Sequence, residues 1–333
     1  MKKKLAIVVS LILVFATLFC TACSNNKAPD ADQPTGLAGT EIKIGTGGTT
    51  GTYYGFCNTM ATVLNDKVGS KLSVVSTGAS KANILNIDDG EVDMAIVQND
   101  VMDYAYNGTS LFEKDGEFKS FSTLGAVYAE VCQVIARADS GITTVADLKG
   151  KKVSVGDSGS GVEFNAQQIL GAYDITFEDI NKQNLSFQAS ADALKDGKID
   201  AAFIVSGAPT NAVTSLATTN DVYLVSLDSA HIADLIEVSP YYSEATIAAD
   251  VYGTPEDVTT VAIAAVIIAA DSVSEDAIYA MTSTIFENLS EISEQHAKGY
   301  EASLEFGASI SDVPYHPGAA KYFAEKGFEV PVK

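Results

Sequence analysis

The chain has 333 residues, of which 47% are hydrophobic and 19% charged, a composition typical of globular proteins. Its formal net charge is −22, and a charge of this sign repels nucleic-acid phosphates and anionic lipid surfaces, which excludes nucleic acid as a partner. The length indicates about two domains, and four Cys are too few for a disulfide scaffold.

The N-terminus has the features of an export signal. Residues 1–4 (MKKK) are positively charged, and the apolar run over 5–19 that follows is too short to span a membrane. Small residues precede Cys23, so we expect 1–22 to be a signal peptide and Cys23 to carry a lipid. Cleavage at a nearby site without lipidation is the alternative. Residues 23–39 are polar with Pro and Gly, which predicts a flexible tether and an extracytoplasmic body anchored to the cell membrane.

The sequence after the tether predicts an order of strand, small-residue loop and helix. A short strand at 41–44 leads into the loop 45–52 (GTGGTTGT), and a second strand at 71–75 leads into 76–80 (STGAS). A third strand is expected at 92–97. Apolar residues at helical spacing follow both loops, namely Phe56, Met60, Val63 and Leu64 after the first, and Ile84, Leu85 and Ile87 after the second.

The same order recurs about 110 residues later. A strand at 152–155 leads into the loop 156–161 (GDSGSG) and a helix, and 196–203 (DGKIDAAF) echoes 89–96 (DGEVDMAI). Strand, helix and strand in this order predict βαβ units with a parallel sheet in each of two lobes. A chance likeness between two common patterns is the alternative.

Two apolar segments are long enough to connect the lobes, at 131–136 and 261–269. We therefore predict an α/β fold of two lobes, each a mostly parallel sheet with flanking helices. A ligand cleft is expected between the lobes, at the carboxyl ends of the strands. The predicted limits are 40–133 and 264–333 for lobe 1, which includes C-terminal helices at 276–289 and 317–326, and 134–263 for lobe 2.

The small-residue loops suit an anion better than a nucleotide. Thr50 occupies the third glycine position of the dinucleotide fingerprint, and the second strand does not end in an acid. Helix N-termini still offer free N–H groups beside hydroxyls, which suit a carboxylate. Either loop alone could be a structural turn, but two loops at one cleft favour a binding site. We expect this site to consist of Thr49, Thr52, Tyr53, Tyr54, Ser158, Ser160 and Gly161, with Ser80 and Gln98 completing the cleft.

Arg137 is the only Arg, and it could either clamp a carboxylate or form a structural ion pair. The three His have no metal-binding spacing, and no nucleophile motif is present, so we expect no enzyme activity, no metal and no cofactor. His316 precedes Pro317 and is expected to cap or pack a helix. Cys57 and Cys132 could form a disulfide or remain buried thiols.

Several segments together resemble the TAXI branch of the solute receptors of TRAP transporters, which have the type II periplasmic-binding-protein fold. The resemblance covers about residues 40–330. It implies a lipoprotein that captures a small organic anion, glutamate-like or another carboxylate, and delivers it to the integral-membrane subunits of an ion-driven TRAP permease. The alternative is a type II binding protein of an ABC importer or a sensor kinase. The segments are IGTGGTTGTYY (44–54), STGAS (76–80), IVQND (96–100), ADSGITTVADLKGKKVSVGDSGSG (138–161), DAAFIVSGAP (200–209) and HPGAAKYFAEKG (316–327).

Overall fold

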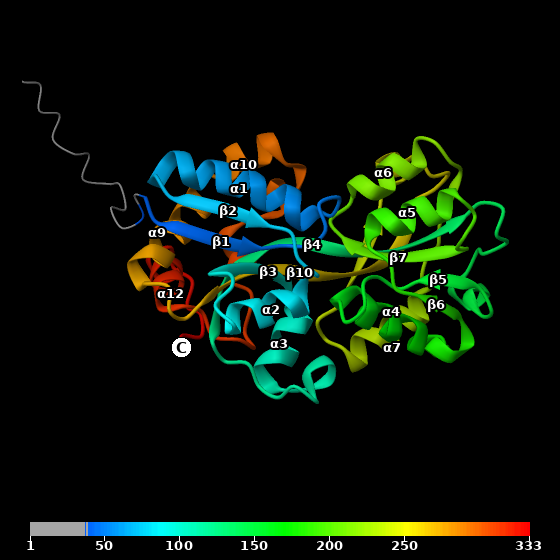
Figure 1. The fold of residues 1–333 in the computed structure, drawn as a ribbon, viewed down its shortest axis with the longest axis horizontal. Coiled ribbons are helices and arrows are strands. Elements are labelled where there is room, and N and C mark those ends of the chain that lie inside the picture. The colour runs from blue at the N-terminus through cyan, green and yellow to red at the C-terminus, as the bar shows by residue number, and fades with distance from the viewer. Residues whose placement is uncertain (1–36, 38) are drawn as a thin grey trace, which may run out of the picture. The chain divides into compact units, whose positions relative to one another are not determined.

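The computed structural model describes Leu37 and residues 39–333 of the chain (Figure 1). The predicted signal peptide, Cys23 and most of the tether lie outside these residues, so the lipid anchor stays a prediction. Within the described part of the chain, no helix is long and apolar enough to cross a membrane.

Ten strands form one sheet, whose main path runs β2-β1-β3-β10-β4-β7-β5-β6. The strands β2, β1 and β3 are parallel, and so are β6, β5 and β7. Between these halves, β10 and β4 are antiparallel to each other and to their neighbours. The bounds are β1 Glu41–Gly45, β2 Lys71–Val75, β3 Met94–Gln98, β4 Phe121–Arg137, β5 Lys152–Ser154, β6 Asn181–Gln183, β7 Ala201–Ser206, β8 Val222–Leu224, β9 Ser243–Ile247 and β10 Val258–Ala270.

Helices cover both faces of each half of the sheet (Figure 1). Over one face lie α1 and α10 in one half and α5 and α6 in the other, while α2, α3, α4 and α7 lie over the opposite face. The bounds are α1 Thr52–Val68, α2 Ser80–Asp88, α3 Asn99–Asn107, α4 Gly161–Ala172, α5 Phe187–Lys195, α6 Asn211–Ala217, α7 Ser229–Val238, α8 Ala249–Tyr252, α9 Glu275–Glu287, α10 Leu289–Gln295, α11 Leu304–Gly307 and α12 Pro317–Glu325, with 3₁₀ turns η1 Ser110–Phe112, η2 Val145–Leu148, η3 Phe177–Asp179 and η4 Ala297–Glu301.

The predicted two-lobe α/β fold, with parallel strands in each lobe, is confirmed. The structure differs in one respect, because the two sets of parallel strands belong to a continuous sheet. The predicted connections at 131–136 and 261–269 are parts of β4 and β10, which have 17 and 13 residues. At about 3.3 Å per residue these strands extend through both halves.

Along each of these two strands, one end belongs to the hydrophobic core of lobe 1 and the other end to the cores of lobe 2. One core, that of lobe 1, takes β4 as far as Tyr128 and β10 from Ala265 onward. The two cores of lobe 2, one on each face of its sheet, take β4 from Val131 and β10 up to Ile263. Strand β3 is buried on both faces, which explains why its first four residues are all apolar.

A specific contact repeats in the two lobes. The Asp93 carboxylate accepts a hydrogen bond from the Lys43 N–H at 2.8 Å, and the Asp200 carboxylate accepts one from the Lys152 N–H at 2.9 Å. Each aspartate thereby joins the loop before a strand to the first strand of its own lobe. The sequence echo between 89–96 and 196–203 therefore corresponds to a structural repeat.

Two smaller predictions are also resolved. Cys57 and Cys132 are buried free thiols, which decides against a disulfide between them, and burial raises the pKa of both. His316 is the N-cap of α12, where its Nδ1 accepts a hydrogen bond from the Gly318 N–H at 3.3 Å, as its position before a proline predicted.

Candidate functional site

The loop 45–52 ends at the N-terminus of α1, which has no compensating charge of its own. Its N-cap, Gly51, has no side chain to accept a hydrogen bond, and the first turn contains no acidic residue. Within the described part of the chain, the N–H groups of Tyr53 and Tyr54 have no acceptor. The positive end of the helix dipole is therefore available to an anion.

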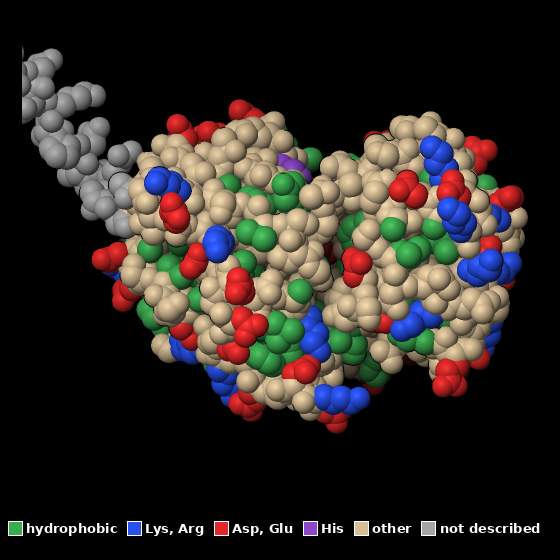
Figure 2. Space-filling model, in the orientation of Figure 1, with side chains coloured by type: hydrophobic (Ala, Val, Ile, Leu, Met, Phe, Trp, Pro, Cys, Tyr) green, Lys and Arg blue, Asp and Glu red, His purple; other side chains and the backbone are tan. Residues whose placement is uncertain are grey.

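This helix end lines a cavity of about 250 Å³ between the two lobes. Figure 2 shows the surface hollowed where the lobes meet, with acidic and basic side chains interspersed over both. Most of the lining consists of backbone groups and small side chains with hydroxyls. Such a surface can offer many hydrogen bonds to a small polar solute. The lining residues are Gly47, Gly48, Thr49, Thr50, Gly51, Thr52, Tyr53, Ser76, Thr77, Ala79, Ser80, Gln98, Glu130, Asp157, Ser160, Gly161, Val162, Ser186, Phe187, Gln188, Val205 and Ser206.

The structure brings most of the predicted site residues together at this cavity. Tyr54 and Ser158 are not among the lining residues, and Ser158 is exposed in its loop. The predicted residues that do line it are Thr49, Thr52, Tyr53, Ser80, Gln98, Ser160 and Gly161.

Arg137 lies in a different surface cavity, at the end of β4. Its Nε donates a hydrogen bond to Asp139 Oδ1 at 3.0 Å, and its Nη2 lies 3.9 Å from Asp200 Oδ1. These contacts fit the structural ion pair rather than a clamp on a solute in the cavity between the lobes.

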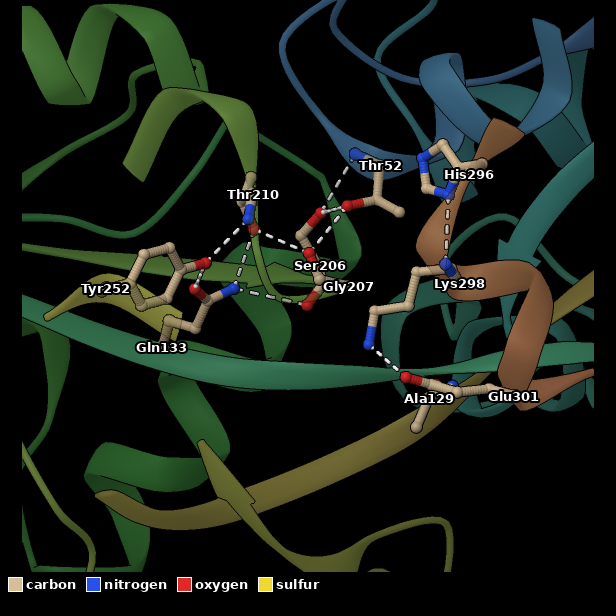
Figure 3. Close-up of polar contacts among 10 residues, drawn as sticks. All are labelled: Thr52, Ala129, Gln133, Ser206, Gly207, Thr210, Tyr252, His296, Lys298 and Glu301. Atoms are coloured by element: carbon tan, nitrogen blue, oxygen red, sulfur yellow. Dashed lines mark hydrogen bonds and ion pairs between the residues drawn. The ribbon is translucent and has the colours of Figure 1, made fainter. Parts of the chain in front are cut away.

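Thr52 connects the lobes (Figure 3). Its N–H donates a hydrogen bond to Ser206 Oγ at 3.2 Å, and its hydroxyl donates one to the Gly207 carbonyl at 2.8 Å. The Ser206 hydroxyl in turn donates to Thr52 Oγ1 at 2.9 Å. Because Ser206 ends β7, these bonds join α1 of lobe 1 to the carboxyl end of a lobe 2 strand.

Gln98 makes a second connection between the lobes. Its Nε2 donates to Asn165 Oδ1 at 3.0 Å, and Asn165 Nδ2 donates to the buried Asp100 carboxyl at 3.0 Å. Burial raises the pKa of Asp100 to about 6, although hydrogen bonds from the Val101 N–H and from Asn165 oppose the shift. Ser80 Oγ accepts the Gln98 N–H. A Cβ on Gly161 would lie 1.8 Å from Gln98 Oε1, so this close approach of the lobes requires glycine.

At the N-terminus of α4, side chains of the same segment accept hydrogen bonds from the backbone N–H groups. Ser160 is its N-cap and accepts the Glu163 N–H at 3.2 Å. Glu163 accepts hydrogen bonds from the Gly159 N–H and from Lys182 Nζ, both at 2.6 Å. Partial burial would raise the pKa of Glu163, but these hydrogen bonds outweigh it and the pKa is lowered.

Glu130 is a site residue that the sequence reasoning missed. It lies in β4, is 2% exposed and lines the cavity. The Tyr53 hydroxyl donates a hydrogen bond to its Oε2 at 2.6 Å. Burial raises the pKa of Glu130 to about 8. The available signal was that Glu130 is the single acid in a mostly apolar strand.

The cavity lining has acidic side chains but no basic ones among the described residues. Among its described lining residues are Glu130 and the more exposed Asp157, but no Lys, Arg or His. The described residues also contain no cluster of three His, Cys, Asp or Glu side chains suited to a metal ion. Any anionic group of a solute must therefore be held by N–H groups and hydroxyls.

The fold is that of the two-lobe periplasmic binding proteins of type II. A protein from Bordetella bronchiseptica RB50 is similar with a TM-score of 0.54 and 18% identity, over 86% of this chain and 89% of that one. A Listeria monocytogenes protein provisionally assigned to L-cystine ABC transport has a TM-score of 0.50 and 13% identity, over 80% and 98%. The alkanesulfonate-binding protein SsuA from Xanthomonas axonopodis pv. citri, bound to MOPS, has a TM-score of 0.49 and 15% identity, over 86% and 84%. At these identities the likeness concerns the fold.

The sequence itself places the chain in a family. Residues 44–327 match the NMT1-like family, and the chain belongs to it. The matched region includes both small-residue loops, both long strands and every residue that lines the cavity.

Proposed function

We propose that this protein is an extracytoplasmic solute receptor that captures a small organic anion between its lobes and delivers it to a membrane transporter. One observation carries the proposal: the N-terminus of α1, without a cap or an acid of its own, opens into a cavity enclosed by both lobes. Backbone N–H groups there, with the Thr49 hydroxyl, would hold a carboxylate or sulfonate.

The lining of the cavity suits binding rather than catalysis. Glu130 is hydrogen-bonded to Tyr53, and the described lining residues include no His, Cys or Lys that could act as a base or nucleophile. The NMT1-like family and the type II fold support the same conclusion. A role without chemistry on the solute is therefore part of the proposal.

Capture would involve rotation of the lobes about β4 and β10. Those strands contain the proposed lobe limits, at 133/134 and 263/264, and they are the main-chain connections through the sheet. The Thr52–Ser206 and Gln98–Asn165 contacts form only when the lobes approach. A solute stabilises this arrangement to the extent that it binds it better than the open one.

Two kinds of transporter are candidates to receive the solute. The resemblance to TAXI receptors supports an ion-driven TRAP permease. An ABC importer is the alternative, and the comparisons favour it, since the Listeria monocytogenes protein is assigned to ABC transport and none of the named proteins to a TRAP system. The neighbouring genes distinguish them: an ATP-binding subunit supports the importer, and a permease of many spans without one supports TRAP.

The anchor is tested separately. A Cys23→Ala protein should leave the membrane fraction as a soluble or unprocessed form if Cys23 carries the lipid. Mature Cys23→Ala protein that still sediments with membranes would show that the anchor lies elsewhere.

The capture itself is tested by thermal unfolding of the purified body against a panel of small carboxylates and sulfonates. A ligand at about 100 times its Kd stabilises the folded state by about 2.7 kcal/mol, which raises the melting temperature by several degrees. Small-angle scattering with that ligand should give a smaller radius of gyration. A panel without any stabilising acid would contradict the proposal.

A further inference from the structure

Glu130 is a buried acid whose ionised form the protein compensates only in part. Its side chain accepts one hydrogen bond, from Tyr53 to Oε2, and among the described residues Oε1 has no hydrogen-bond partner. Burying a carboxylate is costly unless a cation or several donors compensate. Tyr53 supplies one donor, so the ionised form of Glu130 requires further compensation.

The nearest candidates in the protein do not supply it. Lys298, in η4, acts on Glu130 only at a distance, because its ammonium forms an ion pair with Glu301 at 2.5 Å (Figure 3). Asp100, in α3, and Tyr128, on β4 itself, offer no positive charge, and Asp100 disfavours ionisation of Glu130. The cavity is therefore the side from which a cation can approach this carboxyl.

We propose that the solute carries a protonated amine as well as its acid group, and that the amine binds the Glu130 carboxylate while the acid group lies at the N-terminus of α1. The proposal rests on the proposed function and narrows its ligand to a small zwitterion, an amino acid or an aminosulfonate. The ammonium of such a solute is attracted by a chain with a net charge of −22, whereas a simple anion has no group that is.

Binding of an amine has a proton signature. Burial raises the pKa of Glu130 to about 8, so at pH 6.5 this carboxyl is protonated when no amine lies beside it. An ammonium bound beside it favours the ionised form, and the carboxyl proton is released to the buffer. The binding enthalpy then varies with the ionisation enthalpy of the buffer, by close to one proton per solute.

The experiment compares pairs of acids that differ only in the amine: L-glutamate with glutarate, L-alanine with propionate, and taurine with ethanesulfonate. Calorimetry at pH 6.5 in two buffers measures affinity and proton release on wild type and on Glu130→Gln, which keeps the shape and an acceptor for Tyr53. The control is Glu329→Gln, at an exposed position outside the cavity. Thermal unfolding verifies that each variant is folded.

We expect the amine to improve binding at least 100-fold in at least one pair for wild type and for the control. In Glu130→Gln the advantage should fall below about fivefold, and the proton release should disappear. Equal binding of both members of a pair, or an amine preference that survives in Glu130→Gln, overturns this inference while the anion receptor stands. Failure of every compound to bind contradicts the receptor proposal as well.

Discussion

The N-termini of α1 and α4 follow similar loops and line the same cavity, but their charges are arranged differently. At the third helical position α4 has Glu163, a carboxylate that accepts hydrogen bonds from its own loop and from Lys182. The same position of α1 is Tyr54, and the helix has no acid in its first turn. The positive end of α4 is therefore compensated internally, whereas that of α1 is not.

Because of this difference in charge, we expect the two loops to have different roles in binding. The loop of lobe 1 offers hydrogen-bond donors to a solute, and the loop of lobe 2 forms a wall that fits closely against lobe 1 through Gly161. Two loops rich in Gly, Ser and Thr thus look equivalent in sequence, while the residue three positions into the helix separates them. The variants below test this assignment, in order of decreasing expected effect.

Gly161→Val should abolish the fit of the second loop. Its Cβ would lie 1.8 Å from Gln98 Oε1 and 3.0 Å from Val101 Cγ2, so the lobes could not approach as they do. We expect affinity for an acid found in the screen to fall at least 1000-fold, about 4 kcal/mol. Calorimetry measures this, with Gly171→Ala as control because its Cβ has no neighbour within 4 Å. Wild-type affinity in folded Gly161→Val would remove this loop from the site.

The carboxyls near the two helix ends should respond to pH with opposite signs. The pKa of Glu130 is raised to about 8 in the folded protein, so between pH 4.5 and 8 the unfolded chain releases a proton that the folded protein keeps. The free energy of unfolding should therefore fall as pH rises, by roughly 3 kcal/mol at pH 7. Glu163, whose pKa is lowered, stabilises above its ordinary pKa and loses this effect in acid.

Denaturant unfolding at pH 5 and pH 7 measures the Glu130 effect. Glu130→Gln should lose less stability than wild type between these values. A residual decrease should remain, because Asp100, with a pKa of about 6, has the same sign. Parallel curves for Glu130→Gln and wild type would show that Glu130 is ionised in the folded protein.

Thr52→Val tests the contact between α1 and lobe 2. The valine keeps the shape but removes the acceptor of the buried Ser206 hydroxyl and one of the two hydroxyl donors to the Gly207 carbonyl, the other donor being Thr210. We expect about tenfold weaker binding, near 1.4 kcal/mol, and less compaction in small-angle scattering. Thr62→Val is the matched control, an exposed position in the same helix. Equal affinities of the two variants would argue against a role for this contact in closure.

Tyr54→Glu makes the end of α1 resemble that of α4. An acid at this position compensates the helix dipole, which should stabilise the helix slightly and weaken binding of an anion about fivefold, or 1 kcal/mol. Tyr54→Gln controls for loss of the ring. If Tyr54→Glu and Tyr54→Gln bind equally well, the helix end is not where the acid group lies.

The sequence predicted much of the fold, because its signals are local. Alternating strand and helix patterns and the small-residue loops depend on nearby residues, and the echo between the segments at Asp93 and Asp200 shows that this local pattern occurs twice. The continuity of the sheet was missed because the run at 131–136 predicts a strand but not its pairing, which depends on contacts with distant strands.

Site residues in the loops that follow strands could be predicted from the sequence, whereas a site residue in the middle of a strand was missed. Placement after a strand located Thr49, Tyr53 and Gln98 at the cavity. Arg137, the only Arg, also follows a predicted strand but lies in another cavity. Glu130 was overlooked because it belongs to a strand that was considered only as a connection. Its chemistry follows from burial and from Tyr53, which the local sequence does not contain.

The order of strands also constrains when the chain can fold. In the sheet β3 lies between β1 and β10, and Gln98 of β3 pairs with Ala265 of β10, far along the sequence. A growing chain therefore cannot complete lobe 1 until β10 has been synthesised, and β3 presents an unpaired edge until then. This delay leaves the first part of the chain incompletely packed during synthesis, a state that is prone to aggregation.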